Sequence, residues 1–423
     1  MSEAALRVVP VRTAGDLRRF VDLPWRLYAG DPCWVPPLKA QVRGAVEKKH
    51  PFYANGAADR ELFLAWRGTR VAGRIAAITN RAYNAYHSDT SGFFGFFECE
   101  DDAEAATALV AAAAAWVRER GCETLTGPVN PSTNYEAGLL VRGFDTPPTV
   151  MMTYNPPRYG ELLEATGLAK AKDLYAYASP VHAKSLERLE KFADRTRRRE
   201  PDLVIRPVNL KEFASEVQII RDIYNRAWEK NWGFVPVSEA EFNFLAKDLK
   251  PLVDPPLLRI GFVAGDPAGF LLAIPDANPA LAVLNGSMAN PIRLLRAMLI
   301  GRRRVGLRLI TMGVKEQYRL RGIEGVIRSR EALRDIVGTR ALASLSDQTS
   351  TAAVLRESGV QTAATEARAD LFAPRLSHMF LMSERLGGPS VPRSGTRRLC
   401  LRTTDHGRSG ARGPVSTASR TSR

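Results

Sequence analysis

Two arginines and two glycines stand at a strand-to-helix corner in the second half of the sequence, where they could bind a phosphate group. The alternating apolar run Leu307–Val314 predicts a buried strand, and a helix is expected to follow Val326 and run to about Arg334. A helix N-terminus offers unpaired backbone N–H groups and the positive end of its dipole to an anion. Glycine permits close approach of the backbone, and arginine neutralises phosphate charge. The corner contains Arg319, Arg321, Gly322 and Gly325.

A turn-rich segment in the first half, residues 127–138, holds polar side chains that could line a substrate pocket. Its candidates for substrate contact are Asn130, Asn134, Tyr135 and Glu136. Gly-Pro and Asn-Pro steps also occur wherever a chain simply turns. Both interpretations stay open at this stage.

Other familiar catalytic sets are missing from the sequence. The five histidines have no neighbouring nucleophile, so neither a Ser/His/Asp nor a Cys/His set assembles. The four cysteines lie far apart without a CxxC pair, so no metal site is expected, and reduced thiols favour a cytoplasmic location. Glu316 is a conceivable general base, but a solvated loop carboxylate explains it as well, and no catalytic residue is assigned.

The elements that must position these residues occur twice. A short strand at Val8–Val11 and a helix from Asp16 to Tyr28 are echoed by a strand at Leu203–Val208 and a helix from Glu212 to Trp228. In each half a hairpin with a glycine-containing turn follows. Gly73 in the first hairpin corresponds to Gly269 in the second. The sequence therefore predicts two α/β domains in tandem, with chance likeness between two α/β units as the alternative.

The second half resembles the GNAT-type N-acetyltransferases. The run from Lys315 to Ile323, directly after a strand, looks like the acetyl-CoA loop of that family, and the order strand, helix, hairpin is similar in both halves. The family's loop ends in a small residue where this chain has Glu324, a departure that could either stabilise the helix or repel pyrophosphate. The resemblance implies an acetyl-CoA or other acyl-CoA site formed by Met312, Gly313, Val314, Arg319, Leu320, Arg321, Gly322, Ile323, Glu324 and Gly325.

The corresponding corner of the first half is acidic. Five carboxylates lie between Glu98 and Glu104, and these would repel a pyrophosphate. The first half is therefore expected to lack a cofactor loop. The expected organisation is an α/β fold with a mixed sheet in two GNAT-like domains: residues 7–180, a charged linker at 184–202, an acyl-CoA-binding domain at 203–370, and a disordered tail at 381–423.

Charge and composition change towards the end of the chain. The net charge is +15, and no lysine follows Lys315. Residues 381–423 contain 9 Arg, 7 Ser, 6 Gly and 5 Thr but no aromatic residue, a composition that cannot bury enough apolar area to fold. Two explanations stay open: a degenerate second domain with an added tail, or a shifted reading frame after about Val326.

The resemblance implies transfer of an acyl group from acyl-CoA to an amine of a small molecule or peptide. The family often supplies a proton from a tyrosine, but Leu355 stands at that position. A catalytically inactive binding or scaffold protein on the same fold is therefore one alternative. A nucleic-acid-binding protein is another, although no aromatic platform accompanies the arginine clusters. No apolar run reaches the roughly 18 residues of a membrane span.

Overall fold

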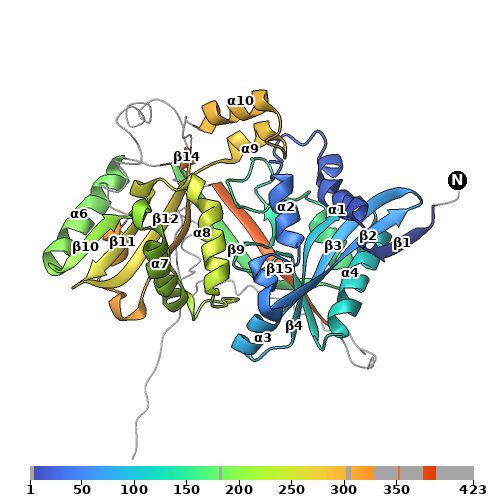
Figure 1. Cartoon of the computed structure of the whole chain (residues 1–423), viewed down its shortest axis with the longest axis horizontal. Coiled ribbons are helices and arrows are strands. Elements are labelled where there is room, and N and C mark those ends of the chain that lie inside the picture. Colours follow the sequence, from blue (N-terminus) through green and yellow to red (C-terminus); the bar gives the residue numbers. More distant parts are fainter. Residues whose placement is uncertain (1–3, 181–182, 302–305, 328–350, 353–374, 387–423) are drawn as a thin grey trace, which may run out of the picture. The chain divides into compact units, whose positions relative to one another are not determined.

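The computed structural model describes residues 4–180, 183–301, 306–327, 351–352 and 375–386 (Figure 1). These residues form a mixed α/β fold, as expected, with antiparallel strand pairs and a parallel pairing of β4 with β5. Both halves of the chain belong to one compact unit that ends at Leu386. No helix among the described residues is both long and apolar enough to cross a bilayer.

The elements alternate between strands and helices in both halves. The first half contains β1 (Leu6–Pro10), α1 (Ala14–Leu27), α2 (Lys39–Val46), β2 (Ala58–Arg67), β3 (Arg70–Asn80), α3 (Arg81–His87), β4 (Ser91–Cys99), α4 (Ala103–Arg118), β5 (Thr124–Gly127), β6 (Val129–Asn130), β7 (Glu136–Ala137), β8 (Leu139–Arg142), α5 (Tyr159–Ala165) and β9 (Ala169–Pro180). The second half contains α6 (Ala183–Arg199), β10 (Leu203–Pro207), α7 (Phe213–Trp228), α8 (Glu239–Leu249), β11 (Leu258–Val263), β12 (Asp266–Pro275), α9 (Asn278–Leu284), α10 (Pro291–Gly301), β13 (Leu307–Val314), α11 (Ile323–Ile327), β14 (Thr351–Ala352) and β15 (Arg375–Arg385).

The internal repeat predicted from the sequence is present in the strand order. The first sheet begins β1-β2-β3-β4, and the second sheet has the same antiparallel order β10-β11-β12-β13. Gly73 pairs with Ala65, and Gly269 pairs with Gly261. In each hairpin the register shifts directly after that pair. The two glycines therefore occupy the same position of one repeated unit.

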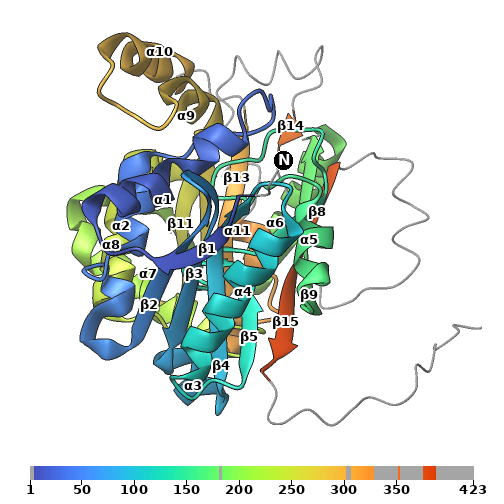
Figure 2. The same ribbon diagram turned by 90° about the vertical axis from the view of Figure 1, so that its right-hand side faces the viewer.

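Each sheet is packed on both faces. In the first half α4 lies over one face of the strands, and its buried residues, such as Leu109, form a core with Tyr159. Phe20 of α1 and Val46 of α2 belong to the core on the other face. In the second half Ile223 of α7 and Ile323 of α11 lie in two separate cores. Figure 2 shows α4 lying along β4 and β5. Alternating apolar strand residues thus fill both layers.

The last described strand belongs to the first sheet, which corrects the predicted tail. β15 lies between β5 and β9 and pairs with both. Leu381 and Met382, which the sequence assigned to the disordered segment 381–423, are fully buried there. The sequence did not identify the short apolar run 379–382 as a strand, because the residues that follow it are rich in arginine and serine. Residues 387–423 lie outside the described residues, as does all of segment 361–371, where the sequence predicts a core strand of the second domain but has a composition poor for one.

The charged linker predicted at residues 184–202 is largely the helix α6. It ends before Pro201, where a proline stops a helix. Ala193 and Thr196 of α6 are buried even though most of the helix is charged. The helix packs against α11, and this contact brings α6 beside the corner that the sequence predicts to bind acyl-CoA.

Candidate functional site

The strand β13 carries a bulge directly before Met312, the first residue of the predicted acyl-CoA site. Its pairing with β12 passes from Leu272–Thr311 to Ala273–Leu309, so Ile310 is an extra residue. Bulges occur often beside active sites, where they redirect a side chain. The hydroxyl of Thr311 is buried and has no hydrogen-bond partner among the described residues. A buried hydroxyl without a partner costs free energy, which a bound ligand would recover.

The face on which Thr311 lies follows from its neighbours. A Cβ added to Gly313 would stand 2.9 Å from Ala227 Cβ of α7, so position 313 faces that helix. Successive strand residues alternate in direction, which places Thr311 on the α7 face as well. Met312 packs on the opposite face with Ile323. Among the described strands β13 pairs only with β12, so its other edge is open there.

The two arginines of the loop after β13 both have partners within the chain. The guanidinium of Arg319 donates from Nε to the carbonyl oxygen of Val314 at 3.2 Å and from Nη2 to that of Ala227 at 2.5 Å. Arg321 donates from Nε to Oε1 of Glu200 at 3.0 Å. In this structure they hold the loop against α7 and the end of α6.

The glycines of the loop make room for α6. Gly322 has a φ of +82°, and a Cβ there would lie 2.7 Å from Thr196 Oγ1. A Cβ at Gly325 would lie 2.1 Å from Cε1 of Phe192. The sequence assigned both glycines to phosphate contact, whereas the structure gives each a packing reason. Of the other predicted cofactor residues, Leu320 is almost fully exposed, Ile323 is buried, and Glu324 lies in the first turn of α11.

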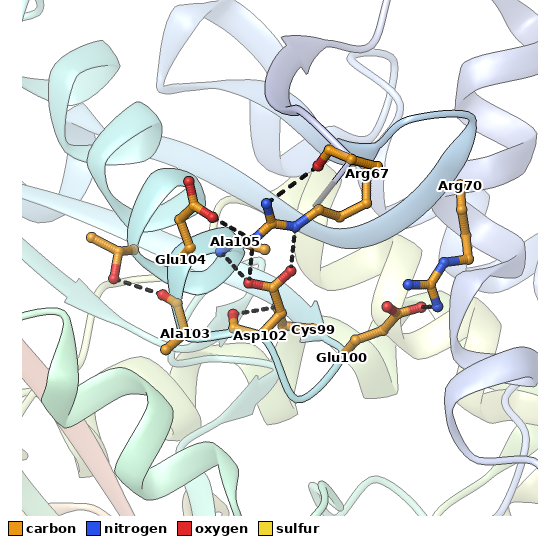
Figure 3. Close-up of polar contacts among 10 residues, drawn as sticks. Arg67, Arg70, Cys99, Glu100, Asp102, Ala103, Glu104 and Ala105 are labelled. Atoms are coloured by element: carbon orange, nitrogen blue, oxygen red, sulfur yellow. Dashed lines mark hydrogen bonds and ion pairs between the residues drawn. The ribbon is translucent and has the colours of Figure 1, made fainter. Parts of the chain in front are cut away.

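The corresponding corner of the first half is occupied by side chains. Asp102 caps α4 by accepting a hydrogen bond from the backbone N–H of Ala105 at 2.9 Å (Figure 3). Arg67 donates to both oxygens of that carboxylate, at 2.8 and 3.0 Å, and it also pairs with Glu104. These hydrogen bonds hold the pKa of Asp102 below its ordinary value. An aspartate therefore occupies the place that an anion would take.

Replacing Asp102 by alanine is expected to lower the free energy of unfolding by about 1–2 kcal/mol, since α4 loses its cap. Asp102→Asn keeps a capping oxygen and should cost less. The pKa of Asp102 is depressed in the folded state, so its charge stabilises the protein above the unfolded-state pKa. That contribution is lost as the pH falls through the folded value. Urea unfolding of the three proteins at pH 7 and pH 3 measures both effects. Equal stability of Asp102→Ala and the parent at pH 7 would contradict the capping role.

The predicted substrate residues of segment 127–138 gather where the two halves meet. Asn134 donates from Nδ2 to the carbonyl of Val235 at 3.2 Å and accepts from the hydroxyl of Tyr224 at 3.2 Å. Tyr135 donates its hydroxyl to Oε1 of Glu241 at 2.8 Å. The segment is thus held by the second half of the chain.

Glu136 is a partly buried carboxylate of this junction. Its Oε2 accepts a hydrogen bond from Nδ2 of Asn130 at 3.5 Å, and the Oδ1 of Asn130 accepts from the N–H of Phe96 at 2.6 Å. Burial raises the pKa of Glu136, and the hydrogen bond from Asn130 and the charge of Arg308 only partly oppose that effect. The carboxyl is consequently a stronger proton acceptor than an exposed glutamate.

Arg308 brings Glu136 to the same side of the second sheet as Thr311. Arg308 and Ile310 lie two residues apart on β13 and therefore on the same face, and Ile310 packs against residues of α7. Because the bulge at Ile310 interrupts the alternation, Thr311 lies on that face as well. Burial lowers the pKa of Arg308 to about 10, while Glu136 and Asp276 favour its charged form. Its guanidinium also donates to the carbonyl of Val150. A carboxylate from one half and a hydroxyl from the other therefore share one junction.

Other residues considered in the sequence lie elsewhere or outside the described residues. The side chain of Glu316 pairs with Lys230 at 2.6 Å and is exposed. Tyr318 donates its hydroxyl to Asp266 at 2.7 Å. Leu355 lies outside the described residues. Within those residues no cluster of three potential metal ligands occurs. A surface groove of about 560 Å³ between α3 and residues 229–233 contains none of the predicted site residues.

Sequence reasoning missed Arg308 and Thr311. The one feature of the sequence that marked them was that each is a polar residue within an otherwise apolar strand. A lone arginine or threonine in a strand does not by itself indicate a functional site. The bulge that turns Thr311 towards α7 depends on pairing with β12, which a local pattern does not record.

Two curated proteins are similar to this chain over most of their length. One, from Caulobacter vibrioides, is described as a bacterial ceramide synthase. It is 38% identical over 324 residues, which cover 75% of this chain and 82% of that protein. The other is protein YghO of Escherichia coli, 34% identical over 341 residues, 78% of this chain and 84% of that protein. The chain belongs to the family of these two proteins. No family model matches it.

The chain has a tandem GNAT-like fold. A tandem GNAT protein from the clavulanic acid biosynthesis pathway has a similar structure, with a TM-score of 0.50 and 12% identity, covering 91% of this chain and all of that one. At that identity the likeness concerns the fold alone. It agrees with the repeated strand order of the two sheets and confirms the resemblance inferred from the sequence.

Proposed function

We propose that this protein is an acyl-CoA-dependent N-acyltransferase whose acceptor is the amine of a long-chain amino alcohol. Ceramide is the amide of a fatty acid and such a base, so the name of the Caulobacter relative describes an N-acyl transfer. GNAT-like folds support acyl transfer from CoA thioesters. The observation that carries the proposal is the partly buried carboxyl of Glu136, which interacts with the charge of Arg308, and Arg308 shares a face of β13 with Thr311, whose hydroxyl has no partner among the described residues.

The residues around β13 fit an acyl-CoA. The open edge of β13 at Met312–Val314 offers backbone groups to the pantetheine arm, and the Thr311 hydroxyl offers a hydrogen bond that no described residue uses. The loop from Arg319 to Gly325 would hold the phosphates by its backbone, with Arg319 and Arg321 fixing the loop. The acyl-CoA supplies an activated thioester. The acidic corner at Asp102 favours a single cofactor site, in the second half.

The side chains of the junction then have separate roles. Glu136 accepts a proton from the acceptor's ammonium group, which frees the nitrogen lone pair. The new C–N bond forms at the thioester carbonyl as the C–S bond breaks. The nitrogen then loses a second proton, which goes to the leaving thiolate so that it departs as CoA thiol, and Glu136 releases the first proton to water. Asn130 orients the carboxylate, and Asn134 and Tyr135 line the acceptor's path. Because acyl-CoA and reduced thiols are cytoplasmic, we place the reaction there.

The Thr311 hydroxyl gives a test of acyl-CoA binding that does not require activity. Thr311→Val keeps the shape of the side chain and removes only the hydroxyl. The affinity for an acyl-CoA should fall about threefold to tenfold, the value of one neutral hydrogen bond. The melting temperature should stay the same or rise, because a buried group without a partner is removed.

Calorimetry with a long-chain acyl-CoA and thermal unfolding of both proteins measure the two effects. Thr126→Val is a matched control, since the Thr126 hydroxyl bonds Ser383 at 2.9 Å and its loss should destabilise without changing acyl-CoA affinity. Unchanged acyl-CoA affinity in Thr311→Val would remove Thr311 from the site. Absence of binding by the parent protein at millimolar acyl-CoA would favour a scaffold protein instead.

A further inference from the structure

The helix α10 presents its large apolar side chains outward. Ile292, Leu295 and Leu299 are 70%, 59% and 52% exposed, and Met298 is equally open. Ala297 is the buried residue of the described helix. Residues 292, 295 and 299 share one face at helical spacing, while Ala297 lies on the opposite side. A surface helix of a globular protein normally has the reverse arrangement.

The position of α10 leaves this apolar face uncovered by the described residues. In Figure 1 and Figure 2 the helix lies at the edge of the ribbon, with α9 between it and the remaining elements. The two helices are joined by a tight turn at Asn285 and Gly286, and Trp25 donates from Nε1 to Oδ1 of Asn285 at 3.1 Å. The helix pair is therefore held to α1 at its base, while α10 projects its apolar face.

The positive charge of the segment around α10 indicates which kind of surface its apolar face would bind. Between Asp276 and Glu316 the sequence contains six arginines and one lysine but no acidic residue. Arg293 and Arg296 flank the apolar face of α10 and are exposed. Leucine, isoleucine and methionine on one face with arginines at its border are the features of helices that lie in a membrane interface. Anionic lipid headgroups complement such a border.

We propose that α10 docks this protein on an anionic membrane surface, with Ile292, Leu295, Met298 and Leu299 inserted among the lipid chains. The docking goes beyond the proposed function and gains a purpose from it, because a long-chain base and its amide reside in membranes. The base of α9 lies beside the junction: Asp276 accepts hydrogen bonds from the N–H groups of Val150 and Asn278, at 2.9 and 3.1 Å. A membrane bound at α10 would thus lie near Arg308 and the proposed acceptor path.

Vesicle flotation of the full chain tests the docking without CoA or amine. The parent protein should float with vesicles of phosphatidylcholine containing 30 mol% phosphatidylglycerol and bind pure phosphatidylcholine much less. Leu295→Gln/Leu299→Gln should weaken binding about tenfold or more, and Arg293→Gln/Arg296→Gln should do so by a similar factor. Val204→Gln, an exposed apolar residue on β10, is the matched control and should bind as the parent does.

Three results would overturn the docking. The first is no flotation of the parent protein, and the second is flotation that both α10 double variants leave unchanged. The third is a dimer in analytical ultracentrifugation that Leu295→Gln/Leu299→Gln dissociates, which would assign the face to a second copy of the chain. Acyl transfer to a short-chain, water-soluble amino alcohol is measured separately. A protein that transfers the acyl group but does not float with vesicles would contradict the docking alone. A protein that floats but does not transfer the acyl group would contradict the proposed function alone.

Discussion

Glu136→Gln is expected to lower the rate of acyl transfer by roughly 10²–10⁴-fold, the range typical of a lost general base. Glutamine has nearly the same shape and can still accept the hydrogen bond from Asn130, so the junction should stay folded. It cannot take a proton from the acceptor's ammonium group. The expected loss therefore lies in kcat, with little change in the affinity for acyl-CoA, whose proposed site lies along β13.

The pH dependence gives this prediction a second readout. Because burial raises the pKa of Glu136, activity should fall as the pH drops through that raised value, where the carboxylate becomes protonated. The residual activity of Glu136→Gln should lack this acidic limb. Glu241→Gln is the matched control: Glu241 lies in the same junction, where it is buried, and glutamine can still accept a hydrogen bond from Tyr135. Equal losses in the two variants, or an unchanged pH profile in Glu136→Gln, would show a structural role only.

Removal of the end of β15 is expected to have the largest effect on stability. A chain that stops at Phe380 lacks Leu381 and Met382, which are fully buried between β5 and β9. Truncating one such side chain to alanine costs about 2–5 kcal/mol, so losing both, together with their strand pairing, should remove most of the roughly 5–15 kcal/mol that stabilises a typical domain. We expect this truncated protein to be unfolded or aggregated.

A chain that stops at Leu386 is the matched control. It keeps β15 and removes only the segment whose arginine- and serine-rich composition cannot form a core. Its melting temperature should match that of the full chain. Leu381→Ala should lower the free energy of unfolding by about 2–5 kcal/mol while leaving the protein folded enough to measure. A normal melting temperature for the chain ending at Phe380 would contradict the placement of β15 in the sheet.

The repeat could be predicted from the sequence because it depends on local patterns. Gly73 and Gly269 each stand in the second strand of a hairpin, and alternating apolar residues with turn signals identify such units. The acidic corner at Asp102 could also be predicted from the sequence, because carboxylates at the start of a helix are typical capping residues. The segment holding Asn130 and Glu136 was marked by its turn residues, although the sequence alone could not show that it meets the second half.

The remaining features depend on contacts between distant segments. β15 pairs with β9 across about half of the chain and with β5 across more than half, and only this pairing reveals that its run at Leu381 is a core strand. Gly322 and Gly325 looked like phosphate-binding glycines, yet Phe192 and Thr196 of α6 explain why a side chain would not fit there. The same glycine pattern suits a close approach to a ligand and a close approach to a helix.

The central claim is that this protein forms an amide from an acyl-CoA and a long-chain amino alcohol. The most direct test incubates the purified full chain with palmitoyl-CoA and sphinganine in mixed micelles, and mass spectrometry quantifies the amide while a thiol reagent quantifies free CoA. We predict that amide and free CoA appear in equal amounts and that Glu136→Gln lowers the rate of formation of both by roughly 10²–10⁴-fold. Binding of palmitoyl-CoA without any amide, for sphinganine and for shorter amino alcohols alike, would contradict the claim.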